Sequence, residues 1–310
     1  MNVLLLGAKG QLGFELNRIL PEFHWGTVHS LSRDELDVAD LNAVEDCLNR
    51  LQPKIIVNAC AYTAVDLAES QSELADTVNH RVPEILAKYA NTSQSILVHY
   101  STDFVFDGQK RSPYLEQDET FPLSVYGKSK LAGEKAILGS GCQHLIFRTG
   151  WLMSAHGQNF LKTMLRLAKE KPDIKVIVDQ QGTPTSAKWL AQMSMRALQQ
   201  CMDQMVAEQP PYWGLYHASS SGVTSWHAYA QEAIAFAQDL GAKHTLRPQD
   251  VLPIPTLDYP LPASRPPYSV LSNLKIIKTF GFQIPDWRDS VHEVIEEIET
   301  SNPPFVTPKK

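Results

Sequence analysis

The chain has 310 residues, enough for two ordinary domains or for one large α/β unit with a smaller region packed on it. Its composition, 43% hydrophobic and 20% charged, is that of a globular protein with a substantial core, and it excludes a disordered or fibrous chain. The formal net charge of -6 disfavours binding to nucleic acid through bulk positive charge.

The four cysteines are scattered, and none stands in a CxxC pair or near a histidine at metal-ligand spacing. This pattern predicts free thiols in a reducing compartment. The apolar run Val3–Leu6 is too short for a signal peptide, and no stretch approaches the roughly 18 apolar residues of a membrane helix. We therefore expect a cytoplasmic protein with no membrane partner.

Short apolar runs alternate with helical patterns through the first half of the chain. The predicted strands are 2–6, 25–30, 55–59, 96–100 and 144–148, and the predicted helices are 13–20, 44–51, 83–90 and 125–138. Such alternation indicates βαβ units and a parallel sheet. The strands at 54–57 and 96–98 are almost continuously apolar, as expected where helices cover both faces. The sequence thus predicts an α/β fold with a doubly wound, parallel Rossmann sheet.

The pattern is looser after Gly150. The predicted helices are 160–169, 187–200, 226–240 and 290–300, the predicted strands are 175–178 and 215–217, and a proline-rich stretch covers 253–267. We expect a dinucleotide-binding Rossmann domain over residues 1–150, completed by parts of 170–220. Residues 151–300 would form a smaller substrate-binding region over the carboxyl edge of the sheet, and 301–310 a frayed tail.

A glycine-rich turn follows the first predicted strand directly. Gly7, Gly10 and Gly13 form a GxxGxxG pattern where the first helix begins. A helix N-terminus offers unpaired N–H groups and a partial positive charge, and glycines let a pyrophosphate approach the backbone. The strand before the turn and the helix after it favour a dinucleotide site over the alternative, a tight turn without a ligand.

The end of the second strand is where Rossmann proteins contact the adenosine ribose, with an acidic residue for NAD or a basic one for NADP. Here no carboxylate stands at the strand tip, whereas Ser32 and Arg33 are suited to a 2′-phosphate. We therefore expect NADPH as the cofactor, with NADH tolerated. The alternative is that Arg33 is an ordinary surface charge.

Tyr126 and Lys130 are neighbours on one face of the predicted helix 125–138, at positions i and i+4. A tyrosine titrates at a pKa of ~10, and an adjacent ammonium favours the phenolate, which suits the phenol to proton transfer. This pair is common by chance, with the tyrosine packed and the lysine solvated. Its occurrence several βα steps after the glycine turn indicates a catalytic pair.

Thr102 follows Ser101 at the end of the predicted strand 96–100. A hydroxyl at the carboxyl end of a central strand can donate to a substrate carbonyl, so we predict a catalytic set of Thr102, Tyr126 and Lys130. The alternative for Thr102 is a cap of a turn or helix.

With these motifs the chain resembles the extended short-chain dehydrogenase/reductases and, within them, the dTDP-4-dehydrorhamnose reductases. The resemblance covers nearly the whole chain. It lies in segments 7–13, 35–38, 57–66, 100–108, 126–134, 147–151, 182–185 and 262–266. Several of these lie in the second half, where a generic Rossmann enzyme would not match.

The resemblance implies roles for further residues. The implied cofactor contacts are Gln11 and Leu12 at the pyrophosphate, Asp37 and Val38 at the adenine, and Ala61, Tyr62, Thr63, Tyr100, Tyr126 and Lys130 on the nicotinamide side. The implied substrate contacts are Thr102, Asp103 and Trp151 at the sugar, and Asn159 and Arg265 at the nucleotide diphosphate. Without these roles, Trp151 would be a core residue, Asn159 a helix cap and Arg265 a surface charge.

The chain departs from the family pattern at two positions. Phe104 stands where the family has tyrosine, and Gly150 stands where it has serine. The hydroxyl missing at Gly150 bears on substrate choice more than on reaction type. Some members of the family are described as using magnesium, which makes the metal an expectation from the resemblance only. We find no compact carboxylate cluster and predict no metal site.

The activity that the resemblance implies is NAD(P)H-dependent reduction of the C4 ketone of dTDP-4-dehydro-L-rhamnose to dTDP-L-rhamnose, a precursor of lipopolysaccharide. Tyr126 would protonate the developing alkoxide, Lys130 would hold the nicotinamide ribose, and Thr102 would orient the carbonyl. The alternatives are a reductase or epimerase of another nucleotide-linked 4-keto sugar, or a catalytically silent dinucleotide-binding regulatory subunit. The expected partner is a dTDP-sugar rather than nucleic acid, and a homodimer is a further expectation.

Overall fold

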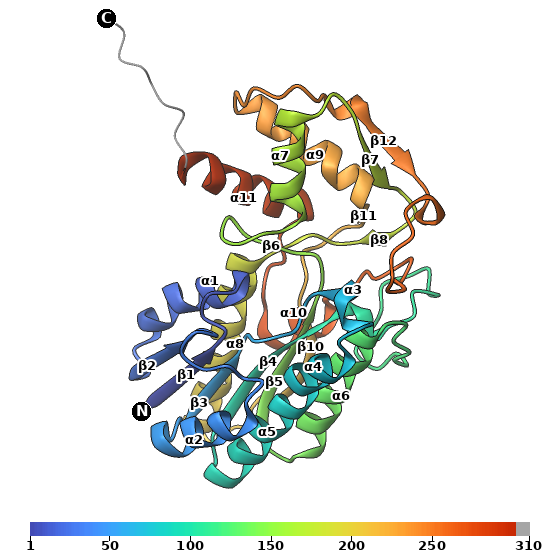
Figure 1. Ribbon diagram of the computed structural model, residues 1–310. Coiled ribbons are helices and arrows are strands. Elements are labelled where there is room, and N and C mark those ends of the chain that lie inside the picture. The colour runs from blue at the N-terminus through green and yellow to red at the C-terminus, as the bar shows by residue number, and fades with distance from the viewer. Residues whose placement is uncertain (302–310) are drawn as a thin grey trace, which may run out of the picture.

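A six-stranded parallel sheet forms the centre of the structure, a computed structural model that describes residues 1–301 (Figure 1). The strands lie in the order β10–β5–β4–β3–β1–β2, and every neighbouring pair is parallel. Their bounds are β1 Asn2–Leu6, β2 Thr27–Leu31, β3 Ile55–Asn58, β4 Ile96–Thr102, β5 Gln143–Thr149 and β10 Gly214–His217. This arrangement confirms the predicted fold class.

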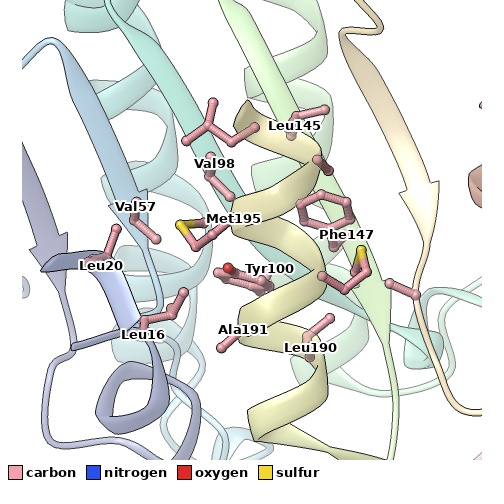
Figure 2. Close-up of a cluster of buried hydrophobic side chains, with 14 of the residues drawn as sticks. Leu16, Leu20, Val57, Val98, Tyr100, Leu145, Phe147, Leu190, Ala191 and Met195 are labelled. Atoms are coloured by element: carbon pink, nitrogen blue, oxygen red, sulfur yellow. The ribbon is translucent and has the colours of Figure 1, made fainter. Parts of the chain in front are cut away.

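Helices cover both faces of the sheet. One face packs on α1 Gln11–Ile19, α8 Ala187–Val206 and α10 Leu274–Phe280, and the other on α2 Leu41–Leu51, α5 Val82–Ser93 and α6 Val125–Gly139. Figure 2 shows the first of these cores, where Met195 and Leu190 of α8 lie over Val98 and Phe147 of the central strands. Because both faces are covered, every residue of β3 and β4 is buried.

The order of the strands creates a switch point at one edge of the sheet. After β2 the chain crosses back past β1 to form β3 on its other side, so the connections that leave β1 and β3 run in opposite directions. In open α/β sheets a ligand binds in the crevice outside the carboxyl ends of such strands. The glycine turn after β1 therefore lies at the position that the topology favours for a ligand.

The second half of the chain forms a smaller layer above the carboxyl ends of the strands (Figure 1). Two apolar clusters hold it together, built from α7 Phe160–Glu170, α9 Trp226–Asp239, α11 Trp287–Ser301 and the parallel pair β7 Ile174–Ile177 and β12 Val251–Ile254. Short strands join the two layers: β6 Leu152–Met153 pairs with β9 Thr185–Ser186, and β8 Gln181–Gly182 with β11 Thr224–Ser225.

Several elements differ from the expectations. The strand predicted over 25–30 begins later, at Thr27, and β12 begins just before the proline-rich stretch and ends inside it. Short helices that no sequence pattern predicted are α3 Val65–Ala68, α4 Ser72–Asp76, the π-helical segment Thr77–Arg81 and α10. Although they lie beyond residue 150, α8 and β10 belong to the layer of the central sheet. The division at residue 150 stays a prediction, and residues 302–310 of the expected tail lie outside the described residues.

Candidate active site

Glycines determine how closely the turn after β1 packs. Gly7 has a φ of +83°, and a Cβ at this position would lie 2.9 Å from the backbone of Ala59. A Cβ at Gly13 would lie 1.9 Å from the carbonyl oxygen of Gly7, so only glycine lets α1 pack against the turn. Gly10 is the N-cap of α1, and no side chain caps the helix. This cradle of exposed backbone at a helix N-terminus fits the pyrophosphate of a dinucleotide.

A cavity of about 240 Å³ opens beside this turn. The predicted cofactor residues on its wall are Gly7, Gly10, Arg33, Asp37, Val38, Ala61 and Tyr62. Arg33 is mostly exposed, and its guanidinium lies 3.6 Å from the Asp37 carboxylate. Ser32 is not part of this wall, and its predicted contact with a 2′-phosphate stays a prediction. It is buried, and its hydroxyl donates a hydrogen bond of 2.8 Å to Glu35, which closes the turn after β2.

A second cavity of about 540 Å³ continues from the first. Gly10, Ala59, Cys60 and Ala61 belong to both walls, so the two cavities are neighbours, and together they are called the cleft below. The remaining predicted residues on the second wall are Gln11, Leu12, Thr63, Tyr100, Thr102, Asp103, Tyr126, Lys130, Trp151, Asn159 and Arg265. The predicted residues from both halves of the chain thus lie around one cleft, except for Ser32 and Gly13.

The start of α6 brings Tyr126 close to the end of β4. Ser124 caps the helix by accepting a hydrogen bond from the Gly127 N–H at 3.1 Å. A Cβ at Gly127 would lie 2.3 Å from the Phe104 carbonyl oxygen, so glycine allows the segment after β4 to pass against the helix. The ring of Phe104 meets that of Tyr126 edge to face, with 5.6 Å between their centres. Thr102, two residues before Phe104, consequently lies beside the Tyr126 phenol.

Burial controls the pKa values of Tyr126 and Lys130. It raises the pKa of Tyr126 to about 12, although a hydrogen bond with Thr102 opposes the shift. Burial also lowers the pKa of Lys130 to about 8, against the attraction of Glu134 and Cys60. The net shift of the Tyr126 pKa is thus upward, away from neutral pH, because burial outweighs the other effects. The Lys130 ammonium donates a 2.6 Å hydrogen bond to the carbonyl oxygen of Tyr100.

Tyr100 contacts Lys130 through its backbone carbonyl. Its side chain lies in the core beneath α8, as Figure 2 shows, and its hydroxyl forms a 2.7 Å hydrogen bond with Ser194. Successive side chains of a strand point to opposite faces of the sheet. On β4 this alternation points the Tyr100 side chain toward α8, while its carbonyl remains available to Lys130. Tyr100 thus reaches the cleft while its phenol lies in the core, and its implied contact on the nicotinamide side stays a prediction.

Asp103 lies almost completely buried next to Gly150. A Cβ at Gly150 would come within 2.6 Å of the Asp103 carboxylate, so the glycine that departs from the family pattern leaves room for this group. Thr102 donates a 3.0 Å hydrogen bond to Asp103. Burial nevertheless raises the pKa of Asp103 to about 6. The cleft therefore holds a carboxyl group that changes its charge close to neutral pH.

Aromatic side chains form the outer part of the cleft. Trp151 has a φ of +46° and stacks on Trp226, with 3.5 Å between ring centres and 8° between planes. A Cβ at Gly182 would lie 2.4 Å from the Trp151 indole. Sequence reasoning missed Trp226 and Tyr229, which also line the cleft. The signal that could have identified them is their spacing of three residues on the predicted helix 226–240, which puts both on one helix face.

Asn159 and Arg265 have structural partners as well as positions on the wall. Asn159 caps α7 by accepting from the Lys162 N–H at 3.0 Å, and its amide donates to Gln11 at 2.8 Å. Arg265 pairs with Asp66 at 2.7 Å and holds the pKa of that carboxyl below its usual value. For these two residues the cap and ion-pair roles are present in the structure, beside their contact with the cleft.

A metal site held by protein alone needs several ligating side chains close together. Within residues 1–301, no group of three or more His, Cys, Asp and Glu side chains is arranged to hold an ion. The magnesium implied by the resemblance stays an expectation. Over the same residues, no helix is both long enough and apolar enough to cross a membrane.

Known proteins resemble the chain over nearly its full length. A family model described as RmlD substrate binding domain matches residues 1–300. The dTDP-4-dehydrorhamnose reductase of Burkholderia thailandensis is 43% identical, with 96% of this chain and 99% of that protein covered. The corresponding protein of Salmonella typhimurium is 42% identical, with 97% and 99% covered.

Solved structures agree. A dTDP-4-dehydrorhamnose reductase from Clostridium acetobutylicum superposes with a TM-score of 0.85 at 35% identity, covering 96% of this chain and 100% of that one. Another from Bacillus anthracis, solved in complex with NADP, gives a TM-score of 0.83 at 32% identity, covering 96% and 99%.

Proposed function

The chain belongs to the RmlD substrate binding domain family, and on that premise we propose that it reduces the C4 ketone of dTDP-4-dehydro-L-rhamnose to dTDP-L-rhamnose. The observation that supports this most directly is the position of Thr102, Tyr126 and Lys130. All three line the cavity that adjoins the one beside the glycine turn, with four residues shared between the two walls. A dinucleotide on the turn and a sugar under the aromatic wall would meet at these residues.

The residues of the cleft account for the proton chemistry of such a reduction. A bound NADPH supplies the hydride for the ketone carbon. Tyr126, with a pKa of about 12, is protonated at neutral pH and donates its proton to the ketone oxygen as negative charge develops there. Thr102 orients that oxygen from the end of β4. Lys130 contacts the nicotinamide ribose and returns a proton from solvent to the phenolate, which restores the enzyme.

Arg33 supports the choice of NADPH. It is the only basic side chain among the predicted residues at the adenosine end of the cleft, and its guanidinium is mostly exposed. A guanidinium binds a phosphate through paired hydrogen bonds, whereas a ribose hydroxyl gains little from it. We expect NADH to be accepted with lower affinity. A magnesium requirement is not part of the proposal.

The first prediction concerns turnover. Purified protein should oxidise NADPH, followed by the absorbance of the reduced nicotinamide, only when dTDP-4-dehydro-L-rhamnose is present, and the product should be dTDP-L-rhamnose. Tyr126→Phe should lower kcat at least about 100-fold, because the proton donor is lost, with little change in NADPH affinity. Tyr89→Phe, a change on the remote helix α5, is the matched control and should leave kcat unchanged.

The two alternative functions, reaction with another 4-keto sugar and a silent subunit, predict different outcomes in this assay. Oxidation with a different nucleotide-linked 4-keto sugar, but not with the rhamnose precursor, would replace the substrate and keep the reaction. Dinucleotide binding without oxidation by any sugar of the panel would instead indicate a silent regulatory subunit. Near-normal turnover of Tyr126→Phe would refute the role of the phenol.

The preference for NADPH over NADH can be tested at Arg33. Arg33→Ala should weaken NADPH binding by about tenfold or more and leave NADH binding almost unchanged, because only NADPH carries the 2′-phosphate. Titration of the intrinsic fluorescence with each dinucleotide measures both affinities. Lys128→Ala, which removes an exposed cation from α6, is the control. An equal loss of affinity for both dinucleotides would contradict the proposed contact between Arg33 and the 2′-phosphate.

The cytoplasmic location and the homodimer stay predictions.

A further inference from the structure

Two buried polar side chains lie behind Lys130, on neighbouring strands. Asn58 of β3 and His99 of β4 occupy directly paired positions in the parallel sheet, and neither has any exposed surface. The Asn58 amide nitrogen lies 3.1 Å from His99 Nδ1, and His99 Nε2 lies 3.3 Å from Lys130 Nζ. These contacts form a chain of hydrogen bonds that ends on the catalytic lysine. The mechanism above assigns no role to Asn58 or His99.

The orientation of the Asn58 amide is determined by its other contact. Its oxygen accepts a 3.1 Å hydrogen bond from the backbone N–H of Cys60, on the wall of the cleft. Within residues 1–301, this N–H has no other acceptor. Rotating the amide would replace this acceptor with a donor, leave the half-buried N–H without its partner and place two donors against each other. The Asn58 nitrogen therefore faces His99.

This orientation determines the tautomer of His99. Burial and the nearby Lys130 hold the pKa of His99 well below its usual value, so the ring is neutral. A neutral imidazole has one N–H and one acceptor nitrogen. Because Nδ1 accepts from Asn58, the hydrogen must be on Nε2, where it faces Lys130. An ammonium has no lone pair with which to accept this hydrogen, whereas a neutral amine has one.

We propose that Asn58 and His99 are positioning residues that favour the neutral amine of Lys130 over its ammonium. The amine accepts from His99 and donates to the Tyr100 carbonyl, so both of its contacts are satisfied. Such a lysine exchanges protons readily near neutral pH. It takes one proton from solvent and passes it to the Tyr126 phenolate, which replaces the single proton that Tyr126 gives to the product. This kinetic role depends on the function proposed above.

Other charged or titratable groups also surround Lys130. They are Tyr126 and Glu134 on its own helix, Cys60 after β3, Asp103 after β4, and Arg148 on β5. Glu134 favours the ammonium, but its carboxylate is already paired with Arg148 at 2.7 Å. Cys60 has a pKa of about 12 and is therefore an uncharged thiol near neutral pH. The Asn58–His99 chain differs from all of these because it acts through the direction of a hydrogen bond.

A direct test uses the nitrogen chemical shifts of histidine in the full chain, which do not depend on any substrate. With ¹⁵N-labelled histidine at about pH 9, above the Lys130 pKa, His99 should carry its hydrogen on Nε2. The signal among the ten histidines is assigned by its loss in His99→Gln. In Asn58→Asp the new carboxylate can accept from both Cys60 and His99 Nδ1, so the hydrogen should move to Nδ1. A wild-type His99 with its hydrogen on Nδ1 would overturn the proposal.

A kinetic test follows the basic limb of the pH profile of kcat. Asn58→Asp should move this limb to higher pH by about one unit or more, because Lys130 then faces an acceptor and keeps its ammonium. A purely structural role would lower kcat equally at every pH. His144→Gln, on β5 and remote from the cleft, is the control and should leave the limb in place.

An unmoved limb in a folded Asn58→Asp variant that still binds NADPH would contradict the proposal. If the expected tautomers appear but no sugar is turned over, the proposed function fails and the hydrogen-bond chain stands.

Discussion

At the scale of single residues, the charge of the cleft changes with pH through Asp103. Its carboxyl is almost fully buried, and burial raises its pKa to about 6, although Thr102 donates a hydrogen bond to it. The folded protein consequently binds this proton more tightly than the unfolded chain does. The resulting stabilisation is complete below the ordinary pKa of a carboxyl and is lost as the pH rises through about 6.

Asp103→Asn should remove this dependence, because an amide keeps the contact with Thr102 and carries no charge. Between about pH 4 and about pH 8, the free energy of unfolding of the variant should improve relative to the parent by about 2 kcal/mol. Urea unfolding at several pH values measures the difference. A constant difference across this range would show that Asp103 titrates normally in the folded state.

The residue scale also shows where sequence reasoning is sufficient. Spacing alone places Tyr126 and Lys130 on one helix face, and the structure has both on the wall of one cleft. The spacing of residues in the sequence could not show that Ser32 turns inward to Glu35 or that the Tyr100 phenol lies beneath α8. Strand ends and helix packing determine these directions, so they depend on segments far away in the sequence. The Lys130 pKa also depends on segments far away in the sequence, because burial lowers it.

At the scale of elements, the turn between β1 and α1 depends on glycine for packing as well as for ligand binding. Gly13→Ala should destabilise the protein by about 1–3 kcal/mol or more, because the new Cβ would overlap the Gly7 carbonyl oxygen, 1.9 Å away. Gly139→Ala, at the end of α6 with no atom within 4 Å of the added Cβ, is the matched control. It should be neutral or slightly stabilising.

The midpoint of chemical unfolding distinguishes the two variants. Equal midpoints for Gly13→Ala and Gly139→Ala would mean that α1 can move away from the turn without cost. The strongly patterned elements around this turn were predictable, since β1 and α1 follow the apolar periods of the sequence. Short helices such as α3 and α4 were not, because they have too few residues to show a period and tertiary contacts hold them in place.

At the scale of the whole molecule, the site exists because two parts of the chain meet. The sheet presents Thr102, Tyr126 and Lys130 at its carboxyl edge, and the layer of α7 and α9 adds Phe160, Trp226 and Tyr229 above them. Figure 1 shows this second layer above the strand ends. The contact from Asn159 to Gln11 joins the second layer directly to the glycine turn.

The fold class, the glycine turn and the position of Tyr126 and Lys130 on one helix face were predictable from the sequence, because alternating apolar segments, glycine spacing and an i, i+4 pair are local patterns. Only the tertiary structure decided which side chains face the cleft, how burial shifts the pKa values of Tyr126, Lys130 and Asp103, and that Asn58 and His99 stand behind the lysine. These properties depend on the neighbours that packing brings together from distant parts of the chain, which no local pattern specifies.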